Sequence, residues 1–373
     1  MLETDVLVIG GGPAGAACAT TLAMNGISVA LVESGRFDSF RIGEALHASA
    51  RGILSFLGLT LESQPWSRRC PRILAAWGQA APTTRPPIFD PHRSGWIVDR
   101  RLLDRALFEG AGRAGARLWE NARVENHGRI NGSWQFSIPA AGGPAVHGLA
   151  RFVVEATGRK GRSTFAPGHS RIWFDRLIGL SLRINIDDRK RDGLEAPAVE
   201  AVADGWWYSV TLNNDDLLLV FYTDADLLPP SHPQRVAFLR DRLRQSHLTK
   251  ERLAALDDEF QVAVFDARSS LRRVAAKDGW AVAGDGLLAC DPLTGKGLCE
   301  ALGSGIEIGH WIEDGLRTDS DGFPGWVDAL RVRVNRYLIE LADVYSQEQR
   351  WTTSEFWRRR HELAKTRAAA LAR

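Results

Sequence analysis

The 373-residue chain lacks the features that mark membrane, nucleic-acid-binding and metal-binding proteins. No apolar run approaches the roughly 20 residues that a membrane-spanning helix needs. The formal net charge of +2 is too small to create a strong field for nucleic acid or a membrane surface. The four cysteines (Cys18, Cys70, Cys290 and Cys299) have no metal-binding spacing and suggest a reducing compartment. Because no basic segment opens the chain as an export signal would, we expect a cytoplasmic protein.

A nucleotide-binding pattern occupies the beginning of the chain. Residues Asp5–Ile9 predict a short buried strand, which runs directly into the glycine-rich sequence Gly10–Gly15. An alanine-rich helix, about Ala14–Asn25, follows, and then a second strand at Ser28–Val32 with the acid Glu33 at its end. A GxGxxG turn between strand and helix, with an acid at the tip of the next strand, predicts adenine dinucleotide binding.

Each part of this pattern has a physical role in holding a dinucleotide. Gly10 permits the tight turn, Gly12 lets backbone amides approach a pyrophosphate, and Gly15 lets the helix pack closely on the strand. The helix N-terminus at Pro13–Ala14 offers free N–H groups and the positive end of the helix dipole to the phosphates. The Glu33 carboxylate can accept hydrogen bonds from ribose hydroxyls. A glycine-rich turn without a ligand is the alternative.

A second glycine-rich segment indicates which dinucleotide is bound. Residues Trp280–Gly284 predict a buried strand that ends at Asp285, and a helix is expected from Gly297 to about Gly309. An aspartate at a strand tip can accept a hydrogen bond from a ribityl hydroxyl, which nicotinamide cofactors lack. A helix N-terminus can stabilise the negative charge that a flavin gains at its pyrimidine edge on reduction. The expected cofactor contacts here are Gly284, Asp285, Pro292, Gly295, Gly297 and Leu298.

These motifs resemble those of the FAD-dependent monooxygenase superfamily, which includes aromatic hydroxylases, flavin-dependent halogenases and geranylgeranyl reductases. In that family the Gly-Asp motif holds the ribityl chain, and the following Asp-Pro…Gly-x-Gly loop lies against the isoalloxazine. The resemblance covers residues 5 to 309 and implies that FAD is the cofactor. It also implies a sheet strand that faces the substrate, which matches Gly205–Val210, and a hairpin partner that ends at Tyr222–Asp224.

Two inner segments narrow the resemblance to the tryptophan-halogenase-like branch. Arg41–Leu46, followed by an apolar helix to about Gly58, is similar to the Gly-Glu segment of that branch. Gly95–Asp104 is similar to its Gly-Trp…Asp-Arg…Asp helix entry, in which the arginine contacts FAD. Spacing to the last aspartate matches Arg100 rather than Arg101. The FAD contacts implied in this part of the chain are Arg41, Arg100 and Val124.

Two departures from the family limit the reaction. Halogenases carry a Trp-x-Trp-x-Ile-Pro signature, which is absent from this sequence. They also use a relay lysine, but the corresponding region here, Arg72–Ala80, contains no lysine, and the first lysine of the chain is Lys160. Because a guanidinium stays protonated, an arginine cannot readily replace that lysine, and halogenation is disfavoured. The Asp-Gly motif of NADPH-linked hydroxylases reads Glu155–Arg159 without the aspartate. The electron donor is therefore open between NAD(P)H and a flavin reductase.

The expected fold class is α/β. It comprises a Rossmann-like FAD-binding domain of the glutathione-reductase/aromatic-hydroxylase type, an interleaved β-sheet substrate domain and a C-terminal helical tail. The expected segments are 1–75, 95–165 and 265–315 for the FAD-binding domain, 76–94 and 166–264 for the substrate domain, and 316–373 for the helices. Parallel strands are expected at 5–9, 28–32, 152–156 and 280–284.

Alternating apolar residues define the expected substrate domain. Its predicted elements are strands at 178–186, 198–202, 207–212 and 217–222, a turn at 213–216 that makes a hairpin of the last two, and a helix at 235–245. The proline-rich stretch Ala81–Pro91 is expected to be a loop, either a lid over the active site or a linker. The basic tail Arg358–Arg373 predicts a helix with a solvated face or, alternatively, a docking site.

The resemblance implies oxygen chemistry, in which the reduced flavin forms a C4a-hydroperoxide that attacks electron-rich aromatic carbons. Candidate acid–base residues are Glu44 and His47 on the expected Gly-Glu helix, and Asp291 beside the flavin. The alternatives are a helix-capping acid, a structural histidine and a loop-shaping aspartate. Cys290 and Cys299 flank the flavin loop, where they are either redox-active or flavin-linked thiols or small buried side chains.

Candidate substrate contacts are Trp206, Trp207 and Tyr208, of which alternate members should face the cavity. With 13 tryptophans in the chain, most are expected to be packing residues, and one or two to face an aromatic substrate. The leading hypothesis is an FAD monooxygenase that hydroxylates an indole-type aromatic. The substrate is a small molecule or a tryptophan in a partner protein, as in tryptophylquinone cofactor maturation. The alternatives are a geranylgeranyl-reductase-like flavoprotein, a disfavoured halogenase, and an FAD-bound maturation scaffold.

Overall fold

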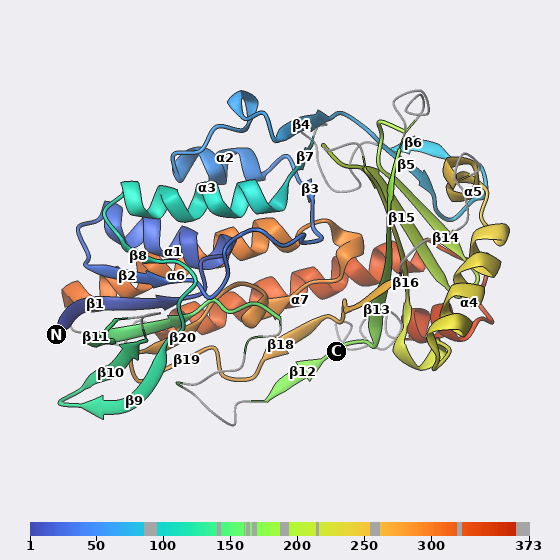
Figure 1. The fold of residues 1–373 in the computed structure, drawn as a ribbon. Helices are drawn as coiled ribbons and strands as arrows, with labels where there is room; N and C mark the ends of the chain where they lie inside the picture. The colour runs from blue at the N-terminus through green and yellow to red at the C-terminus, as the bar shows by residue number, and fades with distance from the viewer. Residues whose placement is uncertain are drawn as a thin grey trace.

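The computed structural model describes residues 1–85, 95–139, 143–159, 161, 165, 170–186, 194–213, 216–253, 262–318 and 323–362. The described chain forms an α/β molecule in which one parallel sheet and one large antiparallel sheet lie side by side (Figure 1). Helices cover one face of the first sheet and the outer face of the second (Figure 1). None of the helices within these ranges combines the length and the apolar character needed to cross a bilayer.

The parallel sheet has the core order β20–β11–β1–β2–β8, in which all four neighbouring pairs are parallel. Val6, Leu7 and Val8 are fully buried, because helices cover one side of the sheet and a β-meander covers part of the other. The four predicted parallel strands are confirmed. The strands of this sheet are β1 (Leu2–Ile9), β2 (Val29–Val32), β8 (Arg117–Trp119), β9 (Glu125–Ile130), β10 (Ser133–Ile138), β11 (Val146–Glu155), β19 (Ala276–Lys277) and β20 (Trp280–Val282).

Three helices cover one face of this sheet: α1 (Pro13–Met24), α3 (Arg100–Arg113) and α6 (Gly297–Thr318) (Figure 1). Helix α1 is buried from Pro13 to Leu22, which explains its apolar sequence on every side. Helix α6 continues nine residues beyond the predicted end at Gly309. The extension is explained by Ile308 and Ile312, which are fully buried and continue the apolar stripe at helical spacing.

Contact between α1 and α6 depends on Gly305. A Cβ atom at this position would overlap the backbone carbonyl of Ala14, whereas a Cβ at Gly303 of the same helix meets nothing within 4 Å. A Gly305→Ala variant should therefore lose about 2 kcal/mol of stability through overpacking. Gly303→Ala should gain roughly 0.5–1 kcal/mol, because alanine is the better helix former. Urea unfolding of both variants checks this, and equal stabilities would contradict the close approach.

The large antiparallel sheet has the order β17–β13–β16–β15–β14–β5–β6, in which only the β14–β5 pair is parallel. Its central hairpin, β15 with β16, confirms the predicted hairpin, although residues 214–215 of the turn lie outside the described ranges. The strands are β5 (Ile73–Ala76), β6 (Thr83–Arg85), β13 (Leu177–Asn185), β14 (Ala198–Val202), β15 (Gly205–Thr211), β16 (Asp216–Asp224) and β17 (Ala263–Asp266). Helices α4 (His232–Gln245) and α5 (Leu248–Leu253) lie along its outer side (Figure 1).

Two expectations about local structure are wrong. The Gly-Glu segment does not enter a helix: Ala45–Leu46 form strand β3, which pairs with β7 (Gly95–Val98), and helix α2 (Ala50–Phe56) begins only after Ser49. The proline-rich stretch is not loop throughout, because β6 pairs with β5, and residues 86–94 lie outside the described ranges. Strand β3 pairs with a strand that is distant in sequence, and β6 pairs with β5 across a turn. Strand β4 (Ser67–Cys70) completes the small sheet around β7.

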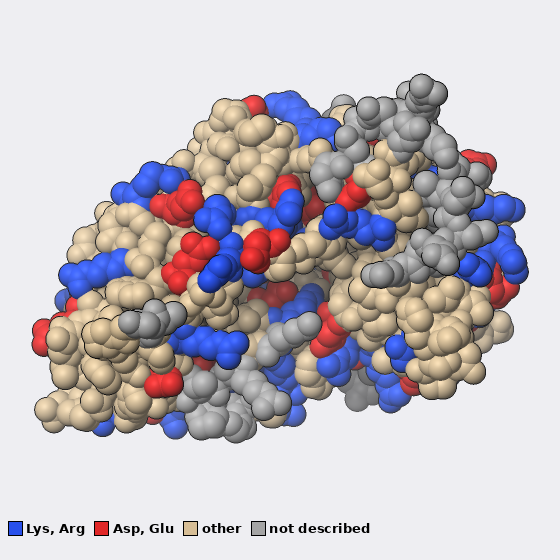
Figure 2. Space-filling model, in the orientation of Figure 1, with Lys and Arg blue, Asp and Glu red and all other residues tan. Residues whose placement is uncertain are grey.

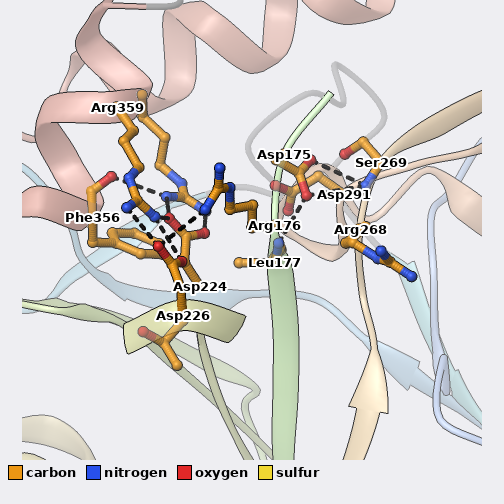
Figure 3. Close-up of polar contacts among 12 residues, drawn as sticks. Asp175, Arg176, Leu177, Asp224, Asp226, Arg268, Ser269, Asp291, Phe356 and Arg359 are labelled. Atoms are coloured by element: carbon orange, nitrogen blue, oxygen red, sulfur yellow. Dashed lines mark hydrogen bonds and ion pairs between the residues drawn. The ribbon is translucent and has the colours of Figure 1, made fainter. Parts of the chain in front are cut away.

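The remaining elements join the two halves of the molecule. A small sheet contains β12 (Arg171–Trp173), β18 (Ser270–Arg272) and β21 (Leu288–Ala289), and short helical turns occur at η1 (Leu61–Ser63), η3 (Ala225–Leu227), η4 (Gly284–Gly286) and η5 (Pro292–Thr294). Helix α7 (Phe323–Ser346) runs from the first half toward the large sheet (Figure 1). Residues 355–362 of the predicted C-terminal helix are helical, and residues 363–373 lie outside the described ranges. Arg359 and Arg360 tie this helix to Asp224 of β16, at 3.0 and 2.9 Å (Figure 3).

Candidate cofactor and active site

The glycine-rich turn after β1 has the shape that a dinucleotide requires. Gly10 has a φ of +104°, and a Cβ at Gly15 would overlap the Gly10 carbonyl oxygen. A Cβ at Gly12 would be 4.0 Å from the nearest atom, the Arg41 guanidinium, so this backbone is open to a ligand. Helix α1 begins at Pro13 with neither a capping side-chain bond nor an acid in its first turn. Its first N–H groups are therefore available to an anion.

Glu33 lies at the end of β2, against the glycine-rich turn. Its carboxylate accepts hydrogen bonds from the backbone N–H groups of Gly11 and Gly35, both at 2.7 Å. Only 6% of Glu33 is exposed, so the residue shapes the turn as well as the place where a ribose would lie. Val124 lies between β8 and β9, partly buried against the main core, at the same end of the sheet.

Two arginines reach the turn from other elements. Arg41 and Arg100 both pair with Asp104 of α3, at 3.1 Å each, and the Asp104 side chain is fully buried. Arg100 also donates to the carbonyl of Ile42 at 3.2 Å. Asp99 caps α3, as its carboxylate accepts from Arg101 N at 2.9 Å, so Arg100 is oriented inward while Arg101 pairs with the cap. The FAD contact expected of Arg100 rather than Arg101 stays a prediction.

A recess lies at the junction of the two halves of the molecule. Figure 2 shows basic and acidic side chains gathered around a hollow in this face. The lining of the recess combines residues of both halves: Phe40, Arg41, Glu44, Val98, Asp99, Arg100, Arg101, Arg183, Leu212 and Asn213. The recess therefore lies between the segments around the glycine-rich turn and the large sheet.

The second glycine-rich segment meets the first although 270 residues separate them in sequence. Gly284 has a φ of +63°, and a Cβ there would lie 2.7 Å from the Cβ of Ala14. The next residue, Asp285, keeps 32% of its side chain exposed, so its carboxylate can accept a further hydrogen bond. Two expected cofactor contacts from opposite ends of the chain are thus neighbours in space.

Arg159 is a site residue that the sequence reasoning missed. It follows the end of β11 and its guanidinium donates to the Asp285 carboxylate at 3.0 Å, the Cys290 carbonyl at 2.6 Å and the Arg268 carbonyl at 2.7 Å. Its position just after a central parallel strand, at the carboxyl edge shared with Gly10, was the available signal. Arg171 supports the same turn by donating to the carbonyls of Asp285 and Gly286.

We expect Arg159→Met to weaken FAD binding by roughly tenfold, the equivalent of ~1.4 kcal/mol, because Asp285 would lose its orienting partner. The control is Arg176→Met, since the Arg176 side chain is 66% exposed and pairs with Asp226 on the surface. Titration of the apo-protein with FAD, followed by quenching of flavin fluorescence, measures both affinities. If the two variants bind FAD equally well, Arg159 does not orient Asp285.

The flavin loop, defined here as residues 291–297, is held by its own first residue. Asp291 accepts from Leu293 N at 2.8 Å and from the Tyr345 hydroxyl at 2.8 Å, and its N–H donates to the Tyr337 hydroxyl at 2.7 Å. Burial, followed by the nearby Asp175 carboxyl, raises the pKa of Asp291 to about 7 (Figure 3). These contacts shape the flavin loop, and a catalytic role of Asp291 stays a prediction.

The other expected contacts of this loop follow Asp291 directly. Pro292 opens the short helix η5, Gly295 ends it with a φ of +61°, and Gly297 begins α6. Leu298 is 9% exposed and packs among apolar residues between α6 and α2. The N-terminus of the 22-residue helix α6 therefore lies beside the turn that carries Asp285.

Glu44 is a deeply buried acid in the lining of the recess. It is 2% exposed, and it accepts from Gly43 N at 2.8 Å. Burial raises its pKa, while the backbone hydrogen bond from Gly43, the neighbouring Tyr208 side chain and the nearby Arg100 lower it by less. Neither Glu44 nor His47 lies on a helix, contrary to expectation: Glu44 precedes β3, and His47 lies in the turn before α2, where Nδ1 contacts Ser49 Oγ at 2.8 Å.

The three aromatic residues of β15 alternate across the large sheet. Tyr208 faces Glu44, and Trp206 stacks on Tyr222 with ring centroids 4.0 Å apart. Trp207 lies on the opposite face, in the apolar cluster that includes Phe221 and Leu239 of α4. Its side chain points away from the recess, because successive residues of a strand face opposite sides. Trp207 is therefore a packing residue. Trp206 is 1% exposed, so its side chain is buried on the opposite face of the large sheet.

The cysteines beside the flavin loop are protonated thiols in this environment. Cys290 is 2% exposed, and burial raises its pKa well above the ordinary value. Cys299, in the first turn of α6, contacts Ser49 Oγ at 3.6 Å, and burial raises its pKa too. Because the thiolate is the nucleophile, these shifts disfavour a covalent link to a flavin.

Glu33, the glycine-rich turn, Arg41, Asp285 and the flavin loop are the residues that would hold FAD. Residues 3–312 match the model of the FAD binding domain family. The chain belongs to this family, and FAD is its cofactor. It is an FAD-dependent oxidoreductase.

Known proteins resemble the chain along its whole length. LodB of Marinomonas mediterranea, whose name describes an FAD-dependent oxidoreductase, is 24% identical over 370 residues, which are 98% of each chain. The structure of QhpG, a peptidyl tryptophan dihydroxylase essential for tryptophylquinone cofactor biogenesis, is 25% identical with a TM-score of 0.77, covering 96% of this chain and 79% of that one. The flavin-dependent halogenase CmlS has a TM-score of 0.82 at 23% identity, covering 100% and 71%, and shows the shared fold.

Proposed function

We propose that the chain is an FAD-dependent monooxygenase that hydroxylates an electron-rich aromatic ring, specifically the indole of a tryptophan within a partner protein. The observation that carries the proposal is the position of the buried Glu44 carboxyl. It lies next to Tyr208 of the large sheet and near Arg100, which also lines the recess. The likeness to QhpG supports a peptide-bound tryptophan as the substrate. A free indole or phenol is the small-molecule alternative.

Bound reduced FAD supplies the activation of molecular oxygen. The protein has to orient the ring, exclude water and remove the proton that the ring loses when oxygen is added. In this proposal Glu44 Oε accepts that proton, since Glu44 lines the recess next to the large sheet. Tyr208 lies next to the Glu44 carboxyl, and the nearby Arg100 stabilises the ionised form of that carboxyl. Asp291 positions the flavin loop through its bonds to Leu293 and Tyr345.

Halogenation is the second candidate, because halogenases, including a tryptophan 2-halogenase of Chondromyces crocatus that is 24% identical, are among the relatives. The relay lysine that they need has no counterpart at Arg72–Ala80. Lys296, in the flavin loop, forms an ion pair with Glu340. A reductase of isoprenoid double bonds is the third candidate, since a digeranylgeranylglycerophospholipid reductase is 23% identical.

The test uses the FAD-loaded protein, reduced without oxygen and then mixed with oxygenated buffer that contains bromide and one substrate. The substrates are free tryptophan, indole and a set of tryptophan-containing peptides. Mass spectrometry of a peptide that gains oxygen on its tryptophan supports the proposal, whereas a brominated product would establish halogenation. Reaction of free tryptophan but of no peptide would overturn the partner-protein substrate. Consumption of no oxygen with any substrate would overturn the monooxygenase.

A further inference from the structure

A chain of five aromatic rings, which the proposed hydroxylation does not use, leads away from the flavin loop. Trp206 stacks on Tyr222 at 4.0 Å between ring centroids, and its Nε1 donates to the Tyr345 hydroxyl at 3.3 Å. The ring of Tyr345 lies 6.0 Å from that of Trp357, which lies 6.2 Å from Trp351 in a stacked arrangement. We call Tyr222, Trp206, Tyr345, Trp357 and Trp351 the aromatic chain.

The aromatic chain meets the flavin loop at Tyr345, its third ring, and reaches the surface at Trp351. The Tyr345 hydroxyl donates to Asp291 Oδ2 at 2.8 Å. The four inner rings are at most 3% exposed, whereas Trp351 is partly exposed. Trp77 provides a parallel branch, since its ring lies 6.0 Å from Tyr345 and 5.3 Å from Trp357. Every step between neighbouring rings is thus close to van der Waals contact.

Indole and phenol rings are among the protein side chains that give up one electron most readily. Electron transfer between rings weakens exponentially with distance, so stacked and touching rings exchange electrons far faster than isolated ones. A phenol that loses an electron also loses its hydroxyl proton, and Asp291 Oδ2 is in place to receive it from Tyr345. The pKa of about 7 lets Asp291 hold that proton near neutral pH and return it.

We infer that the aromatic chain conducts single electrons from the surface to the flavin site, and so removes oxidants that form there when oxygen reacts without a substrate. A hydroxyl radical at the site takes one electron from an inner ring and one proton, and becomes water. The missing electron is replaced stepwise from Trp357 and Trp351, and finally from a small thiol or ascorbate at the surface. Tyr345 passes its proton to Asp291 and regains it on re-reduction.

The charges around Trp351 are compatible with electron transfer along the aromatic chain. Arg350 lies 4.2 Å over the Trp351 ring, where an unbalanced cation would oppose oxidation of the indole. Its guanidinium is paired with the buried Glu348 carboxylate at 2.9 Å, which offsets that field. Trp207, on the other face of the same strand as Trp206, packs against Phe221 instead and provides a matched control.

The test is flash photolysis of the FAD-loaded protein without any substrate, so that its outcome does not depend on hydroxylation. Light-excited oxidised FAD takes one electron from the nearest ring, and transient absorption then follows tryptophan and tyrosine radicals. The wild type should form a long-lived tryptophan radical that external ascorbate removes. Trp351→Phe should lose the ascorbate-sensitive radical, and Trp357→Phe should lose the long-lived signal because the electron returns from nearby rings.

The control variant Trp207→Phe should behave as the wild type. Since Trp351 is partly exposed, Trp351→Phe is expected to fold even if a substitution at the buried Trp357 does not. Formation of no aromatic radical, or equal radical lifetimes and ascorbate sensitivity in the wild type and Trp351→Phe, would overturn the inference. Either result leaves the proposed hydroxylation untouched, because no substrate takes part.

Discussion

A Gly15→Ala variant should be purified without FAD. The added methyl group would overlap the Gly10 carbonyl and approach the Ala156 side chain, so the turn would have to open and the start of α1 would move away from the phosphates. We expect FAD affinity to fall roughly 100-fold, the equivalent of about 3 kcal/mol. Titration of the apo-protein with FAD measures the loss.

The matched control for this variant is Gly52→Ala. Gly52 is also a helical glycine, and a Cβ there meets nothing within 4 Å. FAD affinity should be unchanged in the control, while its free energy of unfolding should rise slightly. Urea unfolding of both apo-proteins separates loss of binding from loss of the fold. A Gly15→Ala variant that keeps the wild-type affinity would show that the turn does not hold the pyrophosphate.

Glu44→Gln should lower kcat by roughly 10²–10⁴-fold while leaving FAD affinity nearly unchanged, as expected for the loss of a general base. The amide keeps the size of the side chain and can still contact Gly43 and Tyr208, but it cannot accept a proton. Glu109→Gln is the control, because the Glu109 side chain is 53% exposed and pairs with Arg105 on the surface. Loss of no more than twofold in kcat would remove Glu44 from the chemistry.

The same variant gives a pH test with a defined sign. A base acts in its ionised form, so the rate should rise with pH as Glu44 loses its proton. Burial raises the pKa of Glu44, and the rise should therefore occur above the ordinary range of a carboxyl group. Glu44→Gln should abolish this rise, whereas Glu109→Gln should retain it. A rise of the wild-type rate that persists in Glu44→Gln would assign the titration to another group.

Local patterns were sufficient to predict the cofactor-binding framework. The βαβ unit around Gly10–Gly15 is contiguous, and its strands are buried on both sides, so composition alone predicts them. The hairpin of β15 and β16 was equally accessible, because alternation and a polar turn at Asn213–Asp216 lie within one short stretch. The same alternation correctly predicts that Trp206 and Trp207 lie on opposite faces of the large sheet.

Features that depend on distant partners could not be predicted in the same way. Glu44 was placed on a helix because an apolar helical run follows it, but Ala45–Leu46 pair with β7, fifty residues later. Arg159 was overlooked because its three acceptors come from residues beyond 260. The hydrogen bond between Asp291 and Tyr345 could not be predicted either, because Tyr345 belongs to α7, which no motif connects to the flavin loop.

The source of the oxygen atom tests the central proposal most directly. The reduced, FAD-loaded protein would be mixed with isotope-labelled O2 in ordinary water, in the presence of the tryptophan peptide that reacts best, and the product analysed by mass spectrometry. Our account predicts one labelled oxygen atom in the hydroxylated indole, and loss of that product in Glu44→Gln. Oxygen derived from water, or a product without added oxygen, would contradict a monooxygenase.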